Sequence, residues 1–305
     1  MEQVIIIGSG PAGLTAAIYA ARANLNPLVI EGMQPGGQLT QTEDVENFPG
    51  FEQPIGGAAL VATIRRQAER LGVRFIMDEV TACDLLGSVK RLSLMMAGDL
   101  ETKSVIIATG ASARYLGLPS EQKLKGRGVS ACATCDGAFF KGKRVAVVGG
   151  GDTAMADALY LARLAAQVTV IHRRDAFRAS KIMADRVLAT ANIEVLWDSV
   201  VEEVLGVEQR AVSGLRIRNV KSGAIIEREL EGVFIAIGHQ PNTAAFEGQL
   251  ERDAEGYIKT EWSRCSVPGV FAAGDVQDRR YKQAITAAGS GCMAALECER
   301  YLAAL

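Results

Sequence analysis

The same order of apolar, small and polar positions occurs twice along the chain, and its first copy begins at the N-terminus. The apolar run Val4–Ile7 leads into a glycine-rich turn, and an alanine-rich segment, Leu14–Ala23, follows. A short continuous apolar run is typical of a strand buried on both faces of a parallel sheet, and the alanine-rich segment has the composition of a helix. The pattern therefore predicts a βαβ unit with Leu28–Ile30 as its second strand.

The turn of this unit, GSGPAG, has the glycine spacing of a dinucleotide-binding loop. Gly8 permits a sharp turn, Gly10 lets the backbone approach a pyrophosphate, and Gly13 lets the helix pack closely on the strand. Glu31 follows the second strand, where this fold places a carboxylate that accepts hydrogen bonds from a ribose. A glycine turn in another kind of α/β protein is the alternative, but the strand, helix and acid in register favour an adenosine without a 2′-phosphate.

The second copy of the pattern begins near the middle of the chain. A strand is predicted at Val145–Val148, and a GxGxxA turn follows with Gly149, Gly151 and Ala154 at its fixed positions. A helix and the apolar run VTVI come next. These features predict a second βαβ unit.

The residues after the second strand of this unit reverse the charge found at Glu31. His172 stands at the corresponding position, and basic residues follow at Arg173, Arg174 and Arg178. Guanidinium groups bind phosphate oxygens through paired hydrogen bonds, whereas a carboxylate repels them. A solvated basic loop is the alternative, but its register against the turn favours contact with a 2′-phosphate. We therefore predict that the second unit binds NADP(H) rather than NAD(H).

A pair of cysteines, Cys132 and Cys135, lies between the two glycine turns in the sequence CATCDG. A thiol pair between two dinucleotide-binding units suggests a relay in which a nicotinamide reduces a flavin and the flavin reduces a disulfide. A zinc site is the alternative, but tetrahedral zinc normally needs four ligands, usually in two close pairs. The histidines are isolated and no second close pair exists, so we predict no metal and interpret the other cysteines as packing residues: Cys83, Cys265, Cys292 and Cys298.

Composition narrows the class of protein. The formal net charge of −2 provides no basic excess to neutralise phosphates, so nucleic acid is a poor candidate partner. No apolar stretch approaches the roughly 20 residues that span a bilayer, and the sequence enters its first strand without a basic leader or a cleavage site. Because the cysteines are also few and mostly scattered, we expect a cytoplasmic protein without a membrane partner.

The two halves also end alike, since Ser104–Arg114 resembles Gly232–Asn242 in having an apolar strand, a glycine and then an exit of the chain. The C-terminal piece, with the strand-like GVFAAGD and a helix, is too short to form a domain and is expected to return to the first unit. We therefore predict an α/β fold of two Rossmann-like dinucleotide-binding domains, one inserted into the other. The discontinuous domain comprises residues 1–114 and 245–305, and the inserted domain comprises residues 115–244.

Any one motif of this chain is shared with other flavoproteins, but a dithiol placed between the two glycine-rich fingerprints is specific to one group and its close relatives. The motifs are, in order, GSGPAG, GGQLTQTEDVENFPGF, ATGASARYLGLPS, CATCDG, GGGDTAMADALYLA, HRRDAFRASK, GVFAAGDV and QAITAAGSGCMAAL. With them the chain closely resembles the low-molecular-weight bacterial thioredoxin reductases over almost its whole length. The resemblance implies a homodimer, a discontinuous FAD domain, an inserted NADPH domain and thioredoxin as the protein disulfide substrate.

The resemblance also implies cofactor contacts, which we carry over by motif. Those of FAD are Ser9, Gly10, Pro11, Ala12, Glu31, Gly32, Gln38, Asn47, Gly274, Asp275, Gln283, Ala284 and Ile285. For NADPH we expect contacts at Gly149, Gly151, Asp152, Thr153, Ala154, His172, Arg173, Arg174 and Arg178. There is also a chemical reason for Asp275, because a carboxylate at a strand end can hold ribityl hydroxyls, although a helix cap is the alternative role.

The resemblance further implies roles in the chemistry. Cys135 would face the flavin, Cys132 would attack the partner disulfide, and Cys135 would then resolve the mixed disulfide. Asp136 is expected to protonate a leaving thiolate and later to act as the base, which requires a raised pKa, while a turn residue is the alternative. Because the dithiol must serve both a shielded flavin and a bulky protein, we expect the inserted domain to rotate between half-reactions.

Two other kinds of function share parts of this pattern. The reductase component of a peroxide-reducing system resembles this chain but carries an N-terminal extension with its own CxxC, and a ferredoxin-dependent relative lacks the basic edge of Arg173 and Arg174. A flavin-binding sensor without turnover would not need Cys132, Cys135 and Asp136 together. The sequence therefore favours a disulfide reductase over both.

Overall fold

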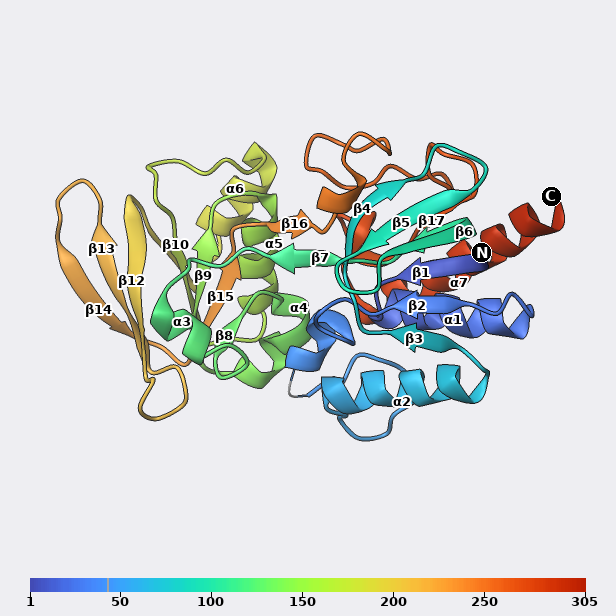
Figure 1. Cartoon of the computed structure of the whole chain (residues 1–305). Coiled ribbons are helices and arrows are strands. Elements are labelled where there is room, and N and C mark those ends of the chain that lie inside the picture. Colours follow the sequence, from blue (N-terminus) through green and yellow to red (C-terminus); the bar gives the residue numbers. More distant parts are fainter. Residues whose placement is uncertain (43) are drawn as a thin grey trace. The chain divides into compact units, whose positions relative to one another are not determined.

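The computed structural model of the chain describes residues 1–42 and 44–305, so that Glu43, within the motif that ends at Phe51, lies outside the described residues. The chain divides into two compact units: the first contains Met1–Ser112 and Gln240–Leu305, and the second contains Ala113–His239. In Figure 1 the blue and red ends of the chain share the first unit, while the green and yellow middle forms the second. The divisions lie a few residues before those expected from the sequence.

The first unit is built around a sheet with the strand order β3-β2-β1-β6-β5-β4, in which β17 also pairs with β6. The pairings among β1, β2, β3, β6 and β17 are parallel, and β5 and β4 extend the sheet in antiparallel fashion. The strands are β1 Glu2–Ile7, β2 Leu28–Ile30, β3 Arg74–Ile76, β4 Val80–Asp84, β5 Lys90–Leu94, β6 Asp99–Ile107 and β17 Val270–Ala272. The pairing of β17 with β6 returns the C-terminal segment to the first unit, as the sequence predicted.

The apolar run of β1 has no polar alternation because both of its faces are buried. Ile6 packs in a cluster with Ala17 of α1 and Ala294 of α7, whereas Ile5 and Ile7 pack in a second cluster on the other face. Small side chains let α1 and α7 lie side by side, as Figure 1 shows. The helices of this unit are α1 Pro11–Arg22, α2 Gly57–Arg70 and α7 Ala284–Ala303.

The second unit repeats this design with the parallel strand order β11-β10-β9-β15-β8. Val145 and Val147 of β9 pack in one core cluster, while Ala146 and Val148 pack in another on the opposite face. A separate antiparallel sheet joins β12, β13 and β14. The strands are β8 Val129–Ser130, β9 Arg144–Gly149, β10 Gln167–Ile171, β11 Ile193–Leu196, β12 Ser199–Leu205, β13 Gly214–Asn219, β14 Ile225–Glu229 and β15 Gly232–Ala236, and the helices are α3 Pro119–Lys123, α4 Ala133–Asp136, α5 Asp152–Leu161 and α6 Lys181–Leu188.

The chain passes from one unit to the other at two places. The first passage runs through β7, Ala111–Ala113, and the second through β16, His239–Pro241. These strands pair as a two-stranded sheet. The glycine and proline residues of the sequence predict crossings near residues 113–119 and 238–248, so β16 lies within the second of these segments, whereas β7 ends where the first begins.

Residues 1–42 and 44–305 contain neither a candidate membrane-spanning helix nor a candidate metal-binding cluster. No helix there combines the length and apolar composition needed to cross a membrane. The same residues contain no group of three or more His, Cys, Asp or Glu side chains arranged to hold a metal ion.

Candidate active site

In the first glycine turn, between β1 and α1, two glycines are required by packing and the middle one is open. A Cβ on Gly8, whose φ is +108°, would lie 2.3 Å from the carbonyl oxygen of Ala108. A Cβ on Gly13 would lie 1.9 Å from the carbonyl oxygen of Gly8. Around Gly10, in contrast, the nearest atom to such a Cβ is 4.0 Å away. The open position lies directly before the N-terminus of α1, where a pyrophosphate is favoured.

The second glycine turn, between β9 and α5, follows the same arrangement. A Cβ on Gly149 would lie 2.4 Å from the carbonyl oxygen of Ala236, so glycine is required there too. A Cβ on Gly151 would meet no atom within 4 Å, which leaves room for the approach of a ligand before α5 begins. Ala154 takes the place of the third glycine and is fully buried. The backbone of each unit therefore leaves room for a ligand at the same point, the N-terminus of the helix that follows the turn.

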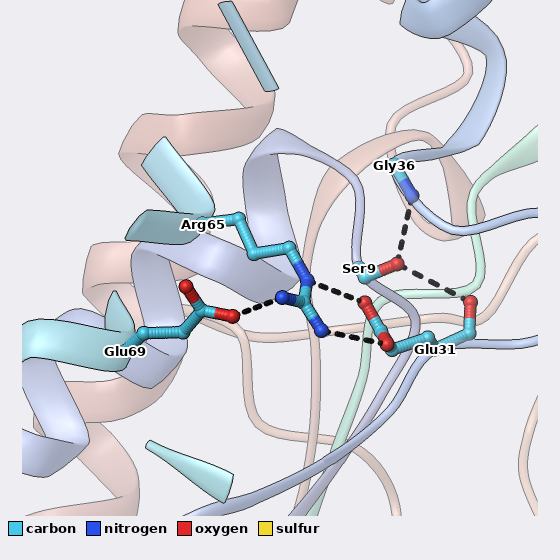
Figure 2. A network of polar contacts seen from close by, with 5 residues as sticks. All are labelled: Ser9, Glu31, Gly36, Arg65 and Glu69. Carbon is cyan, nitrogen blue, oxygen red and sulfur yellow. Dashed lines mark hydrogen bonds and ion pairs between the residues drawn. The ribbon is translucent and has the colours of Figure 1, made fainter. Parts of the chain in front are cut away.

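We call the residues that follow the second strand of each βαβ unit its ribose edge. The ribose edge of the first unit, after β2, carries the buried carboxylate of Glu31 (Figure 2). Arg65 donates from Nε to one carboxylate oxygen and from an Nη atom to the other, each over 3.1 Å. The Ser9 hydroxyl donates to the Glu31 carbonyl over 3.3 Å and accepts from the Gly36 amide over 2.9 Å. The turn, the end of β2 and helix α2 are thus joined by hydrogen bonds at the place where a ribose is expected.

Arg65 is not among the residues that the sequence motifs predict for this site. It lies in the segment IRRQAER beside Arg66 and near Arg70, and nothing in that pattern separates one arginine from the others. Helical periodicity offers the signal, because Arg65 lies four residues after Val61 and three before Ala68, which are both buried, and Arg65 itself is only partly exposed.

The second ribose edge, after β10, has a buried histidine and exposed arginines. The ring of His172 is packed against Phe177 and Trp197, and its Nε2 lies 3.0 Å from the carbonyl oxygen of Ala176. A Cβ on Gly150 would lie 2.2 Å from this ring, so His172 packs directly against the turn. Burial lowers the pKa of His172, and the charges of nearby arginines act in the same direction. The ring therefore supports the turn as a neutral group.

The three arginines predicted at this edge, Arg173, Arg174 and Arg178, are exposed. Among the described residues, none of them forms an ion pair with a carboxylate. The Arg178 amide donates to the Gly150 carbonyl over 2.7 Å, which fixes the basic loop beside the turn. Asp152, at the start of α5, accepts from the Ser180 amide over 2.9 Å and from its hydroxyl over 2.8 Å. The C-terminal end of the loop is thus anchored beside the turn and the start of α5, while the three guanidinium groups stay exposed.

The first unit contains a second largely buried carboxyl, that of Asp275. Asp275 lies in the short helical turn Gly274–Val276 that follows β17, and burial raises its pKa to about 6, with the charge of Asp278 adding to the effect. No hydrogen bond to the Asp275 carboxylate occurs among the described residues. A largely buried carboxyl without a hydrogen-bond partner is suited to accept the hydroxyls of a bound ligand.

Other residues expected to contact the same cofactor also belong to the first unit. Gln38 donates to the Ala111 carbonyl, and Asn47 donates to the side chain of Gln283 over 3.4 Å. Gln283 caps the start of α7. These contacts bring together residues far apart in the sequence, and the contact of Asn47 with Gln283 joins the two parts of the discontinuous unit.

The thiol pair of the second unit is a disulfide. Cys132 and Cys135 are joined at an S–S distance of 2.04 Å, with Cys132 directly before the short helix α4 and Cys135 within it. The amide of Cys132 donates to the Ser130 hydroxyl over 3.0 Å, which ties the start of α4 to the end of β8. A CxxC pair closed across one helical turn is the geometry of a redox-active dithiol.

Asp136, next to this disulfide, has the environment of a proton donor. Burial raises the pKa of its carboxyl, and a hydrogen bond from Ser130 acts in the opposite direction. Tyr115 lies nearby, since the charges of Glu121 and Asp136 contribute to raising the pKa of its hydroxyl, after burial itself. An aspartic acid that keeps its proton to a higher pH than usual can protonate a departing thiolate.

The remaining cysteines differ from this pair. Burial raises the pKa of Cys83 to about 11, of Cys265 to about 12 and of Cys298 to about 11. Such thiols stay protonated and unreactive at neutral pH. All four cysteines outside the pair are free thiols, consistent with packing roles.

Known proteins match this chain along nearly its full length. The model of the family described as pyridine nucleotide-disulphide oxidoreductase matches residues 2–291. A thioredoxin reductase of Rickettsia conorii is 52% identical over 98% of each chain, and one of Streptomyces coelicolor is 53% identical over 100% of this chain and 95% of its own.

Solved structures of thioredoxin reductases also resemble this chain. The thioredoxin reductase from Streptococcus pyogenes has a TM-score of 0.94 and 44% identity, covering 99% of this chain and 98% of its own. The Lactococcus lactis thioredoxin reductase in its FR conformation has a TM-score of 0.68 and 40% identity over 100% of both chains. These similarities and the site together show that the chain belongs to the pyridine nucleotide-disulphide oxidoreductases and, within them, to the thioredoxin reductases.

Proposed function

We propose that this enzyme passes two electrons from NADPH, through FAD, to the Cys132–Cys135 disulfide and then to the disulfide of thioredoxin. The observation that carries the proposal is the division of groups between the units. The disulfide and the arginine-edged turn belong to the second unit, whereas the carboxylate-edged turn belongs to the first. Two different dinucleotides are needed to match two ribose edges of opposite charge.

The first unit is proposed to hold FAD. Its diphosphate would approach Gly10, its ribose would bind Glu31 and its ribityl hydroxyls would bind Asp275, whose largely buried carboxyl fits that role. Bound there, the flavin supplies two-electron transfer between a nicotinamide and a disulfide. The remaining proposed contacts follow the motifs: Ser9, Pro11, Ala12, Gly32, Gln38, Asn47, Gly274, Gln283, Ala284 and Ile285.

The second unit is proposed to bind NADPH. The backbone at Gly149 and Gly151, with Asp152, Thr153 and Ala154 at the start of α5, would hold the diphosphate. Arg173, Arg174 and Arg178 would hold the 2′-phosphate, because they are exposed and always charged. His172 would act through the turn that it supports, since its side chain is buried.

The protein's own residues then carry the disulfide exchange. The Cys132 thiolate attacks one sulfur of the thioredoxin disulfide, a mixed disulfide forms, and the other thioredoxin sulfur leaves with a proton from Asp136. Cys135 next attacks Sγ of Cys132, which restores the Cys132–Cys135 disulfide and releases the second thioredoxin thiol. The two electrons of the dithiol end on the two thioredoxin sulfurs.

We also propose a homodimer located in the cytoplasm, in which the second unit rotates between half-reactions. A dithiol that serves a flavin and a protein substrate in turn needs two positions. The paired crossings β7 and β16 are short enough to act as a hinge, and one solved relative is named for a particular conformation. A cross-link that locks the units together and yet leaves both NADPH-to-flavin transfer and steady turnover intact would contradict the rotation.

The experiment is steady-state turnover of the purified holoenzyme with NADPH and thioredoxin. Replacing Cys135→Ser is expected to leave bleaching of the flavin by NADPH intact while thioredoxin reduction falls to background. Cys292→Ser is the matched control, because this free thiol lies in α7 outside the proposed site, and it should keep full activity. If Cys135→Ser reduced thioredoxin at the original rate, the relay would be wrong.

A further inference from the structure

One arginine contacts the proposed ribose site without belonging to either glycine turn. Arg65 reaches from α2 to both carboxylate oxygens of Glu31, and Figure 2 shows that it also contacts Glu69. Its guanidinium lies 4.3 Å from the centre of the Phe75 ring on β3. Carboxylates on two sides and an aromatic face on a third fix the plane of this guanidinium.

Glu31 is buried, and its position is fixed at both ends. Its amide donates to the Ile76 carbonyl over 2.9 Å, which continues the pairing of β2 with β3. Its carboxylate would be costly to bury without a partner, and Arg65 supplies one in bidentate geometry. An ionised carboxylate has about four acceptor positions, so two remain for other donors.

The charge of Arg65 is offset by the same contacts. The second unit shows the contrast, because Arg173, Arg174 and Arg178 lie at the equivalent edge and, in the described part of the chain, pair with no carboxylate. An arginine paired with Glu31 and Glu69 has little attraction left for a phosphate.

We propose that Arg65 is a positioning residue that holds the Glu31 carboxylate toward the adenosine ribose of the flavin cofactor and makes the first unit select a ribose without a 2′-phosphate. The inference rests on the proposed binding of FAD to the first unit. It also predicts that Arg65 becomes a phosphate ligand once Glu31 loses its charge.

The test measures equilibrium binding of FAD to the apoprotein by fluorescence, and displacement of FAD by AMP or by adenosine 2′,5′-bisphosphate. These two competitors differ only in the 2′-phosphate. Because displacement of FAD is the signal, binding of either competitor to the second unit is silent. Arg66→Met is the matched control, since Arg66 is the next residue of α2, is exposed and contacts Thr63 instead.

Arg65→Met is expected to weaken FAD binding about tenfold, the effect of losing one charge-assisted interaction. The FAD affinity of Arg65→Lys should fall between those of wild type and Arg65→Met, because lysine keeps the charge but lacks the paired N–H donors of the guanidinium. Glu31→Gln should raise the affinity for adenosine 2′,5′-bisphosphate relative to that for AMP by about tenfold. Combining Glu31→Gln with Arg65→Met should abolish that gain. If the role of Arg65 were purely structural, the ratio of the affinities for the bisphosphate and AMP would not depend on it.

The inference is overturned if Arg65→Met binds FAD as tightly as Arg66→Met, or if the double variant keeps the bisphosphate gain. Thermal unfolding of each apoprotein checks that it is folded. If Arg65→Met does not fold, the comparison of Arg65→Lys with wild type decides the question by the same criterion. A wild-type apoprotein that fails to bind FAD would instead contradict the proposed function and not the role of Arg65 alone.

Discussion

The two units use one backbone design and opposite side-chain charges. Gly10 and Gly151 are the open positions of their turns, while the glycines before them, Gly8 and Gly149, are required by contact with a neighbouring strand end. At the ribose edge the first unit has a carboxylate held by an arginine, and the second has exposed arginines above a buried histidine. In the proposed function, the fold therefore determines where a phosphate binds, and a few side chains after the second strand determine which nucleotide that phosphate belongs to.

The units also differ in the chemistry they carry. The disulfide and the raised-pKa carboxyl of Asp136 occur in the second unit, while the raised-pKa carboxyl of Asp275 occurs in the first. Asp136 stands beside a group that must be protonated, whereas Asp275 stands where a cofactor is expected. The same physical effect, burial of a carboxyl, is thus interpreted as acid catalysis in one unit and as ligand binding in the other.

The largest expected effect comes from removing the acid of the second unit. Asp136→Asn should lower kcat/KM for thioredoxin by about 10²- to 10⁴-fold, the usual contribution of a positioned general acid. Because the pKa of Asp136 is raised, the wild-type rate should decline on the alkaline side as the carboxyl loses its proton, and the variant should lack that decline. Asp185→Asn, an exposed aspartate of α6, is the control. An unchanged pH profile in Asp136→Asn would remove the acid from the mechanism.

Replacing the buried carboxyl of the first unit, that of Asp275, should make the apoprotein more stable. The folded pKa of Asp275 is about 6 against 3.8, so folding favours the protonated form, and this favourable contribution is lost as the pH rises through about 6. Asp275→Asn should therefore stabilise the apoprotein by about 3 kcal/mol at pH 8, and by little near pH 4, while weakening FAD binding. Urea unfolding at both pH values measures this. Equal stability of variant and wild type at pH 8 would show that burial does not disfavour the ionised carboxylate in the unliganded protein.

Removing charge from the ribose edge of the second unit should reduce its preference for a ribose that carries a 2′-phosphate. Arg173→Ala combined with Arg174→Ala is expected to lower the preference for NADPH over NADH at least about tenfold, because charge-assisted hydrogen bonds to the 2′-phosphate are lost. Ratios of kcat/KM for the two nucleotides, with thioredoxin as acceptor, measure the change. Arg186→Ala on α6 serves as a control that removes charge elsewhere in the unit. An unchanged preference in the double variant would contradict the phosphate-site assignment.

The smallest effect separates the two turns. Gly10 has φ −70° and Gly151 has φ −99°, so alanine fits either backbone, and a methyl group intrudes only on a bound ligand. Gly10→Ala should weaken FAD binding and Gly151→Ala should raise KM for NADPH, each about fivefold. Gly8→Ala, in contrast, should disrupt the fold. If Gly10→Ala affected NADPH and left FAD unchanged, the assignment of cofactors to units would be reversed.

Much of this arrangement follows from local sequence. The sequence predicts the buried parts of β1 and β9, Val4–Ile7 and Val145–Val148, because both faces of each are covered and their residues are continuously apolar. The ribose edges stay predictions that rest on the distance from the turn that this fold fixes. Arg65 was missed because α2 reaches Glu31 only in three dimensions. The burial of His172 was missed as well, since it depends on Phe177, Trp197 and the absence of a side chain at Gly150.

The most direct test of the two-unit relay is a single-turnover experiment without oxygen or thioredoxin. One equivalent of NADPH is added to the oxidised holoenzyme, and the flavin absorbance and the free thiols are followed together. We predict that the flavin of the wild type bleaches and then recovers as the thiols of Cys132 and Cys135 appear, whereas the flavin of Cys135→Ser stays bleached. Appearance of these thiols in the wild type without any bleaching of the flavin would contradict the account.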